Sequence, residues 1–390
     1  MIYYNGYKNA GCLVNWVRSD AVYTIGGIDL VFVCIAGICD PNAVAAPMVA
    51  AASAVGSRAF TANWSIVSGA TGYRLDVSAN STFSSYIPGY SNLDVGNLTT
   101  RIVSGVGAGT TNYYRVRAYN AARTSTNSGI IAVTTIPPPP ALGAATNISS
   151  SGFTAKWSSA NGATGYRLDA SANSTFSSYV SGYQDLAVSN VLSQSASGLN
   201  AGTVYYYRVR AYNTSGTSSN SATNSVTTVP AAPTANAATT VTSGGFTANW
   251  GSATGAMGYR LEVSTNASFV SYVTGYSNVD VGRLLSQTVS GLSAGTAYYY
   301  RVRAYNSGGT SDSSGTVGVS TIPPLLSSVL QSGNIVLAWG TNTRGFALEY
   351  TTNLASPNWT SNPASPPIVN GQYTVTNPPT GARKFFRLKK

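Results

Sequence analysis

Apolar and polar side chains alternate along residues 205–213, which read YYYRVRAYN. The odd-numbered positions up to 211 hold Tyr, Tyr, Val and Ala, whereas the even-numbered positions hold Tyr and Arg. Successive side chains of a β-strand point to opposite faces, so this period of two predicts a strand with one face buried. The same alternation predicts strands at residues 153–157 and 166–170. Gly, Ser, Asn and Thr cluster between these segments, which predicts turns.

The whole pattern recurs along the chain with a period of 93 residues. YYYRVRAYN returns at residues 298–306, and the close variant NYYRVRAYN occupies residues 112–120. A unit of this length closes its own core, and none of its stretches has helical spacing, so the repeat predicts a string of like all-β domains. Other landmarks keep the same offset: Trp64, Trp157 and Trp250; Tyr73, Tyr166 and Tyr259; Pro47, Pro140 and Pro233.

The order of motifs within one repeat resembles a fibronectin type III domain of the bacterial extracellular kind. A Trp is followed by Tyr-Arg-Leu and then by Gly-Leu-x-Ala-Gly-Thr-x-Tyr-Tyr-Tyr-Arg-Val-Arg-Ala-Tyr-Asn. The resemblance implies an immunoglobulin-like sandwich of seven or so strands, with Trp157 in the core on strand B and Tyr166 and Leu168 on strand C. It also implies that Tyr205 opens strand F as a corner tyrosine, with its hydroxyl tied to the preceding loop. The first repeat has Asn112 at that position, so its corner is expected to be held differently.

The resemblance covers residues 47 to about 323 and divides the chain into five parts. We expect an N-terminal segment at 1–46, repeats at 47–137, 138–230 and 231–323, and a carboxy-terminal β domain at 324–390. Prolines lie at each joint between repeats. Because proline fixes φ, these joints are expected to act as short stiff spacers and the array as a rod.

Residues 324–390 are interpreted as a fourth, diverged and apparently incomplete sandwich. Three segments align with repeat three: 335–339 with 246–250, 346–349 with 259–262, and 381–390 with 295–304. Lys384 takes the place of the corner tyrosine, and nothing corresponds to the strand expected at 313–321. This part also resembles the short carboxy-terminal β domain of secreted verrucomicrobial and planctomycete proteins. A domain of that kind would serve as a secretion or anchoring tag.

Residues 1–46 match no repeat and hold the apolar run 28–38 (IDLVFVCIAGI) and all three cysteines. One interpretation is a secretory leader that ends at Ala-Val-Ala-Ala before Pro47. The other, which we favour, is an ordered β segment. Cys12, Cys34 and Cys39 allow one disulfide with one thiol left over, and the sequence does not say which pair forms.

The net charge of +11 raises the question of a nucleic-acid partner. Arginine pairs recur at 115/117, 208/210 and 301/303, and acidic residues recur on the outward face of the neighbouring strand at Asp76, Asp169 and Glu262. Cross-strand pairing therefore accounts for these arginines, and sequence-specific nucleic-acid recognition has no support. The remaining charge would give weak attraction to anionic glycans or matrix polymers.

Composition points to the extracellular space or the cell surface. Only 8% of the residues are charged and 26 are tyrosines, a balance typical of contact surfaces built from Tyr, Ser, Thr and Asn. No run of 18 apolar residues occurs, so no transmembrane helix is expected.

The chain lacks histidine, which removes His-dependent triads, most zinc sites and the usual proton shuttle. No loop clusters the Asp and Glu that calcium needs, and no glycine-rich loop opens a helix. Asp94, Asp185 and Asp280 fall in turn-rich sequence, where they are expected to be surface residues. We therefore expect no catalysis, no metal and no cofactor.

Two classes of function remain after these exclusions. The first is an extracellular structural or adhesive protein, a subunit of a homopolymeric surface fibre. The second is a carbohydrate-associated array that accompanies a secreted polysaccharide-degrading system. The second requires an exposed aromatic platform, and Trp16 and Trp359 are the tryptophans outside the expected core positions.

Two sets of residues are candidates for assembly. A sandwich that stops at strand F leaves an unpaired edge, which strand addition by residues 28–38 of the next subunit would cover, and such a head-to-tail contact builds a fibre. The candidate residues for this contact are Ile28, Leu30, Phe32, Cys34, Phe385, Phe386 and Leu388. The outward Tyr and Arg stripe is a second candidate, for lateral contacts, against the alternative of a solvated sheet face. Its tyrosines are Tyr113, Tyr119, Tyr206, Tyr212, Tyr299 and Tyr305.

Overall fold

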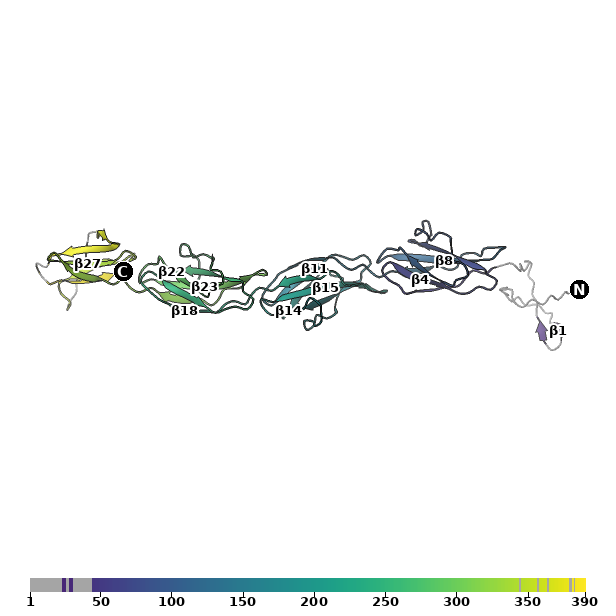
Figure 1. Ribbon diagram of the computed structural model, residues 1–390, viewed down its shortest axis with the longest axis horizontal. Coiled ribbons are helices and arrows are strands. Elements are labelled where there is room, and N and C mark those ends of the chain that lie inside the picture. The colour runs from purple at the N-terminus through teal and green to yellow at the C-terminus, as the bar shows by residue number, and fades with distance from the viewer. Residues whose placement is uncertain are drawn as a thin grey trace.

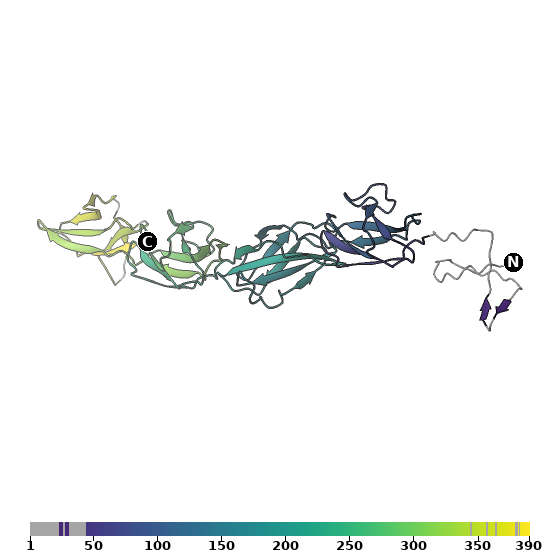
Figure 2. The same cartoon turned by 45° about the vertical axis from the view of Figure 1, so that its right-hand side comes forward.

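The computed structural model describes residues 44–343, 345–355, 358–362, 365–378, 381 and 383–390, together with strands β1 (Tyr23–Ile25) and β2 (Ile28–Leu30). This part of the chain is all-β, as the alternating pattern predicts. Apart from the β1–β2 pair, its sheets fall into four groups with separate cores, which follow one another as four sandwiches in a line (Figure 1). The line stays extended when the molecule is turned by 45° (Figure 2), so the array is a rod.

The first three sandwiches share one plan, a three-stranded sheet that packs on a larger one. In the first, the sheets are β3 (Val49–Ser53), β4 (Ala59–Trp64), β7 (Thr100–Ser104), and β6 (Leu93–Asp94), β5 (Gly72–Ser78), β8 (Thr111–Tyr119), β9 (Ile131–Thr134). In the second, they are β10 (Leu142–Thr146), β11 (Gly152–Trp157), β14 (Ser193–Ser197), and β13 (Leu186–Val188), β12 (Gly165–Ser171), β15 (Val204–Asn213), β16 (Gly216–Thr217), β17 (Asn224–Thr227). In the third, they are β18 (Ala235–Thr239), β19 (Phe246–Trp250), β22 (Ser286–Val289), and β21 (Val279–Asp280), β20 (Gly258–Ser264), β23 (Ala297–Asn306), β24 (Gly309–Thr310), β25 (Val317–Ser320).

The fourth sandwich keeps two facing sheets but pairs its last strand differently. The sheets are β26 (Ser327–Gln331), β27 (Asn334–Gly340), β31 (Gln372–Asn377), β30 (Ile368–Val369), and β29 (Thr360–Ser361), β28 (Ala347–Thr351), β32 (Phe385–Lys389). Strands β27, β28 and β32 fall in the segments that align with repeat three. Among the described strands, β32 pairs with β28 alone, whereas β23 of the third sandwich also pairs with β24 and β25.

In the alternating strands, the apolar residues at every second position are buried in the cores. Tyr205, Tyr207, Val209 and Ala211 are all buried on one face of β15. The tryptophans expected inside are 5%, 4% and 3% exposed at Trp64, Trp157 and Trp250, so that prediction is confirmed. Burial of each large apolar side chain contributes about 1.5–3 kcal/mol to the free energy of folding. The buried faces of these strands therefore stabilise the sandwiches.

The corners of strand F are held in two ways. The hydroxyl of Tyr205 accepts a hydrogen bond from the backbone N–H of Asn200 at 2.9 Å, and Tyr298 does the same for Ser293 at 3.0 Å. In the first sandwich the buried side chain of Asn112 donates instead to the carbonyl of Thr110 at 3.2 Å. The expected corner tyrosine and the expected departure in repeat one are both confirmed.

The acidic residues on the outward face of strand C are buried, which the alternating pattern did not predict. Asp169 is 2% exposed because the segment after β12 folds back over that face, with the backbone N–H of Val180 donating to the carbonyl of Ala170 at 2.9 Å. The expected cross-strand pair is present, since Arg208 Nε lies 3.0 Å from the Asp169 carboxylate. The Arg208 guanidinium also stacks on Phe176, 4.1 Å from the ring centre. Asp76 and Glu262 are covered in the same way.

Candidate functional site

The joints between sandwiches are contacts of backbone on backbone. A Cβ built on Gly109 would lie 1.8 Å from the carbonyl oxygen of Asn161, and one on Gly162 would lie 2.2 Å from the carbonyl oxygen of Gly109. The second joint repeats this contact, because a Cβ on Gly202 would lie 2.2 Å from the carbonyl oxygen of Thr254. No side chain fits between the sandwiches at these points, so the glycines allow the two bodies to touch.

At each of these two joints, an asparagine side chain of the following sandwich donates a hydrogen bond to the backbone of the sandwich before it. The Asn213 side chain donates from Nδ2 to the carbonyl of Thr135 at 2.9 Å, and Asn306 donates to the carbonyl of Thr228 at 2.9 Å. Both asparagines lie at the end of strand F, where the chain turns toward β16 or β24. The β15–β16 and β23–β24 hairpins are thus each hydrogen-bonded to the end of the sandwich before them.

The third joint is built from different groups. Gly295 packs on the Phe346 ring, and the carbonyl of Asn342 accepts a hydrogen bond from the backbone N–H of Ala294 at 2.9 Å. The ammonium of Lys390 donates to the carbonyl of Gly295 at 3.0 Å and to Thr296 Oγ1 at 2.9 Å. Asn342 also donates from Nδ2 to the carbonyl of Ser243 at 2.7 Å, so an asparagine and Lys390 both hold this joint. Figure 1 places the C-terminal residue beside the third sandwich.

The stiffness expected from the prolines has a more specific source in these contacts. The linker is tied to the first sandwich, because the backbone N–H of Ile136 donates to the carbonyl of Gly56 at 3.0 Å. Each joint then adds a glycine contact and an asparagine or lysine clamp. Sequence reasoning found the prolines but missed the clamps, although the repeated Asn-x-x-Gly at 213–216 and 306–309 was a visible signal.

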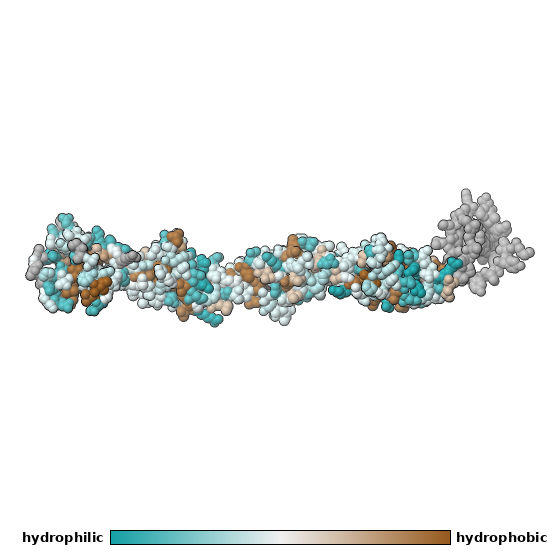
Figure 3. All heavy atoms as spheres, turned by 90° about the horizontal axis from the view of Figure 1, so that it is seen from above, coloured by the Kyte–Doolittle hydropathy of each residue, from teal (hydrophilic) through white to brown (hydrophobic). Residues whose placement is uncertain are grey.

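The side of the fourth sandwich next to β32 is open within the described residues. In the third sandwich, β25 pairs with residues 297–300 and contacts β18, and it closes the same side. In the fourth sandwich β26 is exposed along its whole length, with Val329 56% and Leu330 71% exposed. Figure 3 shows apolar surface on this sandwich. The feature combines an unpaired strand edge with exposed apolar side chains.

The predicted assembly residues of the carboxy-terminal part lie together on β32. Phe385, Phe386 and Leu388 are half-buried, and the last two pack against the core around Trp339. Opposite them, Arg387 donates to Glu349 at 2.9 Å, which repeats the arginine–acid pair of the other sandwiches.

The predicted donor residues lie in part outside the described residues. Ile28 and Leu30 are in β2, where their register partners are Ile25 and Tyr23 of β1. Phe32 and Cys34 fall outside the described residues, as do Cys12, Cys39 and Trp16. Figure 1 shows β1 at the end of the rod opposite to the fourth sandwich, so the structure does not bring β2 to β32 of the same chain.

The stripe of outward tyrosines divides into two groups. Tyr119, Tyr212 and Tyr305 cover glycines across the strand pair, and a Cβ on Gly72 would lie 2.5 Å from the Tyr119 ring. The other members, Tyr113, Tyr206 and Tyr299, are half-buried opposite serines of strand C. Half of the stripe therefore has a role inside its own sandwich.

The hydroxyl of Tyr119 donates to the Asp94 carboxylate at 2.9 Å. The backbone N–H of Gly96 and this hydroxyl lower the pKa of Asp94, and the same hydrogen bond raises the pKa of Tyr119. Asp280, Gly282 and Tyr305 repeat the arrangement in the third sandwich. These acidic residues thus have structural partners.

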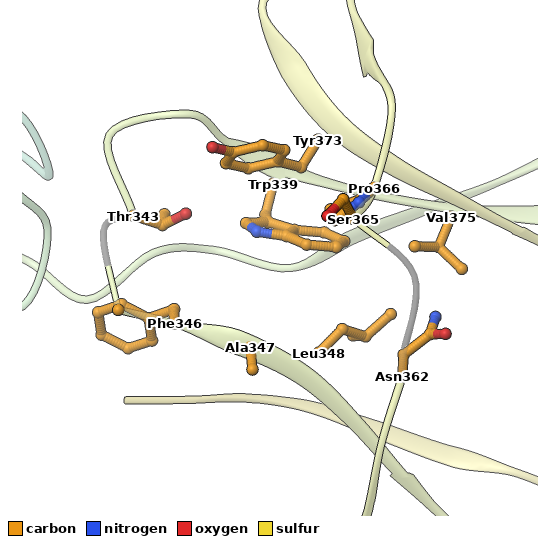
Figure 4. Close-up of a pocket in the computed structure, with 11 residues that line it drawn as sticks. Trp339, Thr343, Phe346, Ala347, Leu348, Asn362, Ser365, Pro366, Tyr373 and Val375 are labelled. Carbon is orange, nitrogen blue, oxygen red and sulfur yellow. The ribbon is translucent and has the colours of Figure 1, made fainter.

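A cavity of about 370 Å³ lies between the two sheets of the fourth sandwich (Figure 4). Its walls combine the aromatic and aliphatic side chains of Trp339, Phe346, Leu348 and Tyr373 with the polar groups of Thr343, Asn362 and Ser365. Trp339 is 2% exposed and packs on Tyr373 at 5.8 Å between ring centres. The cavity shows that the small fourth core is packed less completely, which sequence reasoning did not predict.

Trp359, the candidate aromatic platform, is covered on one face by an arginine of its own chain. The Arg387 guanidinium lies 4.0 Å from the ring centre, so it covers one face of the half-buried indole. A flat sugar-stacking surface needs an open ring face, and Trp359 does not offer one on this side.

The chain is similar to one protein family and to several known proteins. Residues 231–319 match the family profile of the Fibronectin type III domain. The chain is 26% identical over 340 residues, 82% of its length, to the Kelch domain-containing protein SSO1033 of Saccharolobus solfataricus, and it spans 42% of that protein. The solved FN1–FN3 domains of chicken CNTN1 align over 72% of this chain and 99% of their own, with 19% identity and a TM-score of 0.31.

The third sandwich therefore matches the fibronectin type III family, whose domains suggest an adhesive or structural module of the extracellular type. Among the described residues, no helix is long and apolar enough to cross a membrane.

Proposed function

We propose that the protein is a structural or adhesive rod of the extracellular space or cell surface, whose copies join head to tail into a fibre. The observation that supports this is the open side of the fourth sandwich. There, β32 has a partner strand on one side only within the described residues, and Val329 and Leu330 are exposed on β26 of the facing sheet. Unpaired strand edges with apolar neighbours are the surfaces to which another chain adds a strand.

The proposed occupant is the apolar run 28–38 of a second copy. Residues Ile28–Leu30 already adopt the extended conformation in β2, which is the conformation that strand addition requires. Because β1, the partner of β2, lies at the opposite end of the rod from β32, pairing between residues 28–38 and β32 would join two copies. A contact between opposite ends does not close on itself, so it propagates as a fibre.

Electron microscopy of the full chain and of a variant lacking residues 1–40 tests this proposal. We expect fibres from the full chain, and folded rods that do not polymerise from the variant. Fibres from the variant, or isolated rods from the full chain at high concentration, would show that the proposed donor is wrong. Circular dichroism of both proteins provides the control, because the sandwiches are expected to remain folded without these residues.

We also propose that the protein has no catalytic activity. The lack of histidine supports this, as does the engagement of the repeated acids Asp76, Asp169 and Glu262 with arginine. Incubation of the pure protein with polysaccharide and peptide substrates is expected to release no product. Reproducible hydrolysis that survives repurification would contradict the proposal.

A further inference from the structure

Each joint of the rod brings two kinds of sandwich end together. We call the end that carries the turn before strand C the entry pole, and the end that carries the turn before strand F the exit pole. Gly162 on the entry pole of the second sandwich packs on Gly109 on the exit pole of the first, and Gly255 packs on Gly202 in the same way. The line of sandwiches leaves the entry pole of the first and the exit pole of the fourth at its two ends (Figure 1).

The entry pole of the first sandwich keeps the glycine turn of a joint. Gly69 lies 93 residues before Gly162, and the two have similar positive φ angles of 78° and 68°. A Cβ on Gly162 would lie 2.2 Å from the carbonyl oxygen of Gly109, whereas no described atom lies within 4 Å of a Cβ on Gly69. The first sandwich therefore presents the conformation of a joint turn without a described partner.

Two large apolar side chains are exposed close to this turn. Met48 and Ile66 are each 77% exposed, and they lie near each other at the end of β4, because the carbonyl of Met48 accepts a hydrogen bond at 2.8 Å from the backbone N–H of Ser65. The second and third sandwiches, whose entry poles are joined to a neighbour, hold small or polar residues at the same two positions: Ala141, Ser159, Thr234 and Ser252. Clustered exposed apolar side chains are typical of protein–protein contact surfaces.

The exit pole of the fourth sandwich has matching features. Leu330 and Ile335 are 71% and 39% exposed, and they pair across the β26–β27 hairpin next to its turn. That turn lies at the end remote from the third sandwich, because β27 runs from it toward Asn342, which is hydrogen-bonded to the third sandwich. Gly381 lies at the same end, before β32, and aligns with the joint glycine Gly295. It has a positive φ, and no described atom lies within 4 Å of a Cβ built on it.

The direction of the missing strand leads to the same pole. In the third sandwich β25 runs antiparallel to β23 and ends opposite Ala297, at the exit pole from which the chain passes to the fourth sandwich. A donor strand in the corresponding place beside β32 would also end at the exit pole. The first sandwich of the donor copy would therefore follow at that pole, as the fourth sandwich follows the third.

We propose that the entry pole of the first sandwich docks on the exit pole of the fourth sandwich of a second copy, as a further joint of the kind that the chain builds within itself. Met48 and Ile66 pack against the β26–β27 hairpin, and the turn of Gly69 meets the turn of Gly381. This inference rests on the head-to-tail assembly proposed above. It adds a second contact surface, and it makes successive copies continue one straight rod.

Electron microscopy of variants of the full chain tests this contact. Ile66→Asp places a charge on the entry pole, and Gly69→Asn places a side chain between the two turns. Both positions are exposed and asparagine tolerates the left-handed region, so the rods are expected to fold, which thermal unfolding checks. Each variant is expected to raise the protein concentration at which fibres form about tenfold, the loss expected for one buried apolar side chain.

The matched control is Gly89→Asn in the same sandwich. Gly89 has a similar φ of 83°, and no described atom lies within 4 Å of a Cβ built on it. This variant carries the same change at a turn outside the entry pole, so it is expected to form fibres as the wild type does.

A photoreactive amino acid in place of Ile66 identifies the surface that the entry pole touches. In fibres of mixed isotope-labelled and unlabelled copies, cross-links are expected to join position 66 of one copy to residues 329–335 of another. Cross-links to residues 1–46 or to another surface, or normal assembly of both variants, would overturn this contact and leave strand addition standing. Absence of fibres from the full chain would overturn the head-to-tail assembly and this contact together.

Discussion

The third and fourth sandwiches are built on the same plan and differ in how they are closed. Both place a tryptophan in the core and pair an arginine of strand F with a glutamate of strand C, at Arg301 and Glu262 and at Arg387 and Glu349. The third closes one side with β25 and grips its neighbour through Asn306. The fourth, within the described residues, has no strand in the place of β25, and it contacts its neighbour through Asn342 and Lys390 instead of a hairpin asparagine.

The difference separates the features that form the core of a sandwich from the features that contact neighbouring sandwiches. The arginine–acid pair and the tryptophan persist in a smaller sandwich with a cavity beside Trp339. The edge beside strand F and the hairpin that follows it differ between the two sandwiches, and these are the parts that can contact another domain or another copy of the chain. We infer that the fourth sandwich is specialised for a contact that the first three do not make.

Substitution of the core tryptophans is expected to have the largest effect on stability. Trp250→Ala is expected to cost the third sandwich about 3–5 kcal/mol, because it leaves a large void in a closed core. Trp339→Ala is expected to cost less, since Trp339 already borders a cavity. Hydrogen exchange at increasing urea concentration reports each sandwich separately. Equal losses at the two positions would mean that the two cores are packed alike.

Substitution at a joint glycine is expected to bend the rod. Gly202→Ala places a Cβ 2.2 Å from the carbonyl oxygen of Thr254, so the second and third sandwiches must move apart. The matched control is Gly198→Ala, which has a similar positive φ but nothing within 4 Å of its Cβ. Both variants carry the left-handed strain of about 1–2 kcal/mol. In small-angle X-ray scattering only Gly202→Ala is expected to shorten the maximum dimension, and an unchanged profile would mean that the contact does not set the joint.

The outward stripe is expected to respond differently at its two kinds of tyrosine. Tyr212→Ser uncovers Gly165 and is expected to destabilise the second sandwich by about 0.2–1 kcal/mol, the range for a cross-strand pair. Tyr206→Ser is expected to weaken lateral association while thermal unfolding stays nearly unchanged. Light scattering measures the association. If Tyr206→Ser assembles as the wild type does, the stripe is a solvated sheet face.

The smallest effect is expected at extremes of pH, in the third sandwich. Burial raises the pKa of Tyr300, and the hydrogen bond to Asp280 raises that of Tyr305. Their raised pKa values favour the neutral form in the folded state, so this stability is full below about pH 10 and is lost as the pH rises further. The backbone N–H of Gly282 lowers the pKa of Asp280, so the stability from that group is lost as the pH falls below about 4. Tyr305→Phe is expected to reduce the change at both ends, and an unaltered pH profile would contradict this.

The repeated sandwiches were predictable because their patterns are local and occur three times. The period of two placed the buried tyrosines of β15, and the 93-residue offset placed the tryptophans. The buried position of Asp169 was not predictable, because it depends on a segment that folds back over the sheet. The joints were missed for a similar reason, since contacts between Gly202 and Thr254 join residues of different repeats.

The candidate site was predictable only in outline. The alignment of residues 381–390 with strand F placed Phe386 on the last strand, and the lack of a counterpart to β25 indicated an open side. The exposure of Leu330 and the cavity beside Trp339 depend on how completely the small core is packed, which no local pattern encodes.

Hydrogen exchange at the edge of β32 tests the central claim most directly. The backbone amides of residues 383–388 that face away from β28 are expected to exchange slowly in concentrated full-length protein. They are expected to exchange quickly in the variant lacking residues 1–40, and to become protected again when a peptide of residues 28–38 is added. Rapid exchange in assembled full-length protein, or full protection in the truncated variant without peptide, would contradict head-to-tail strand addition.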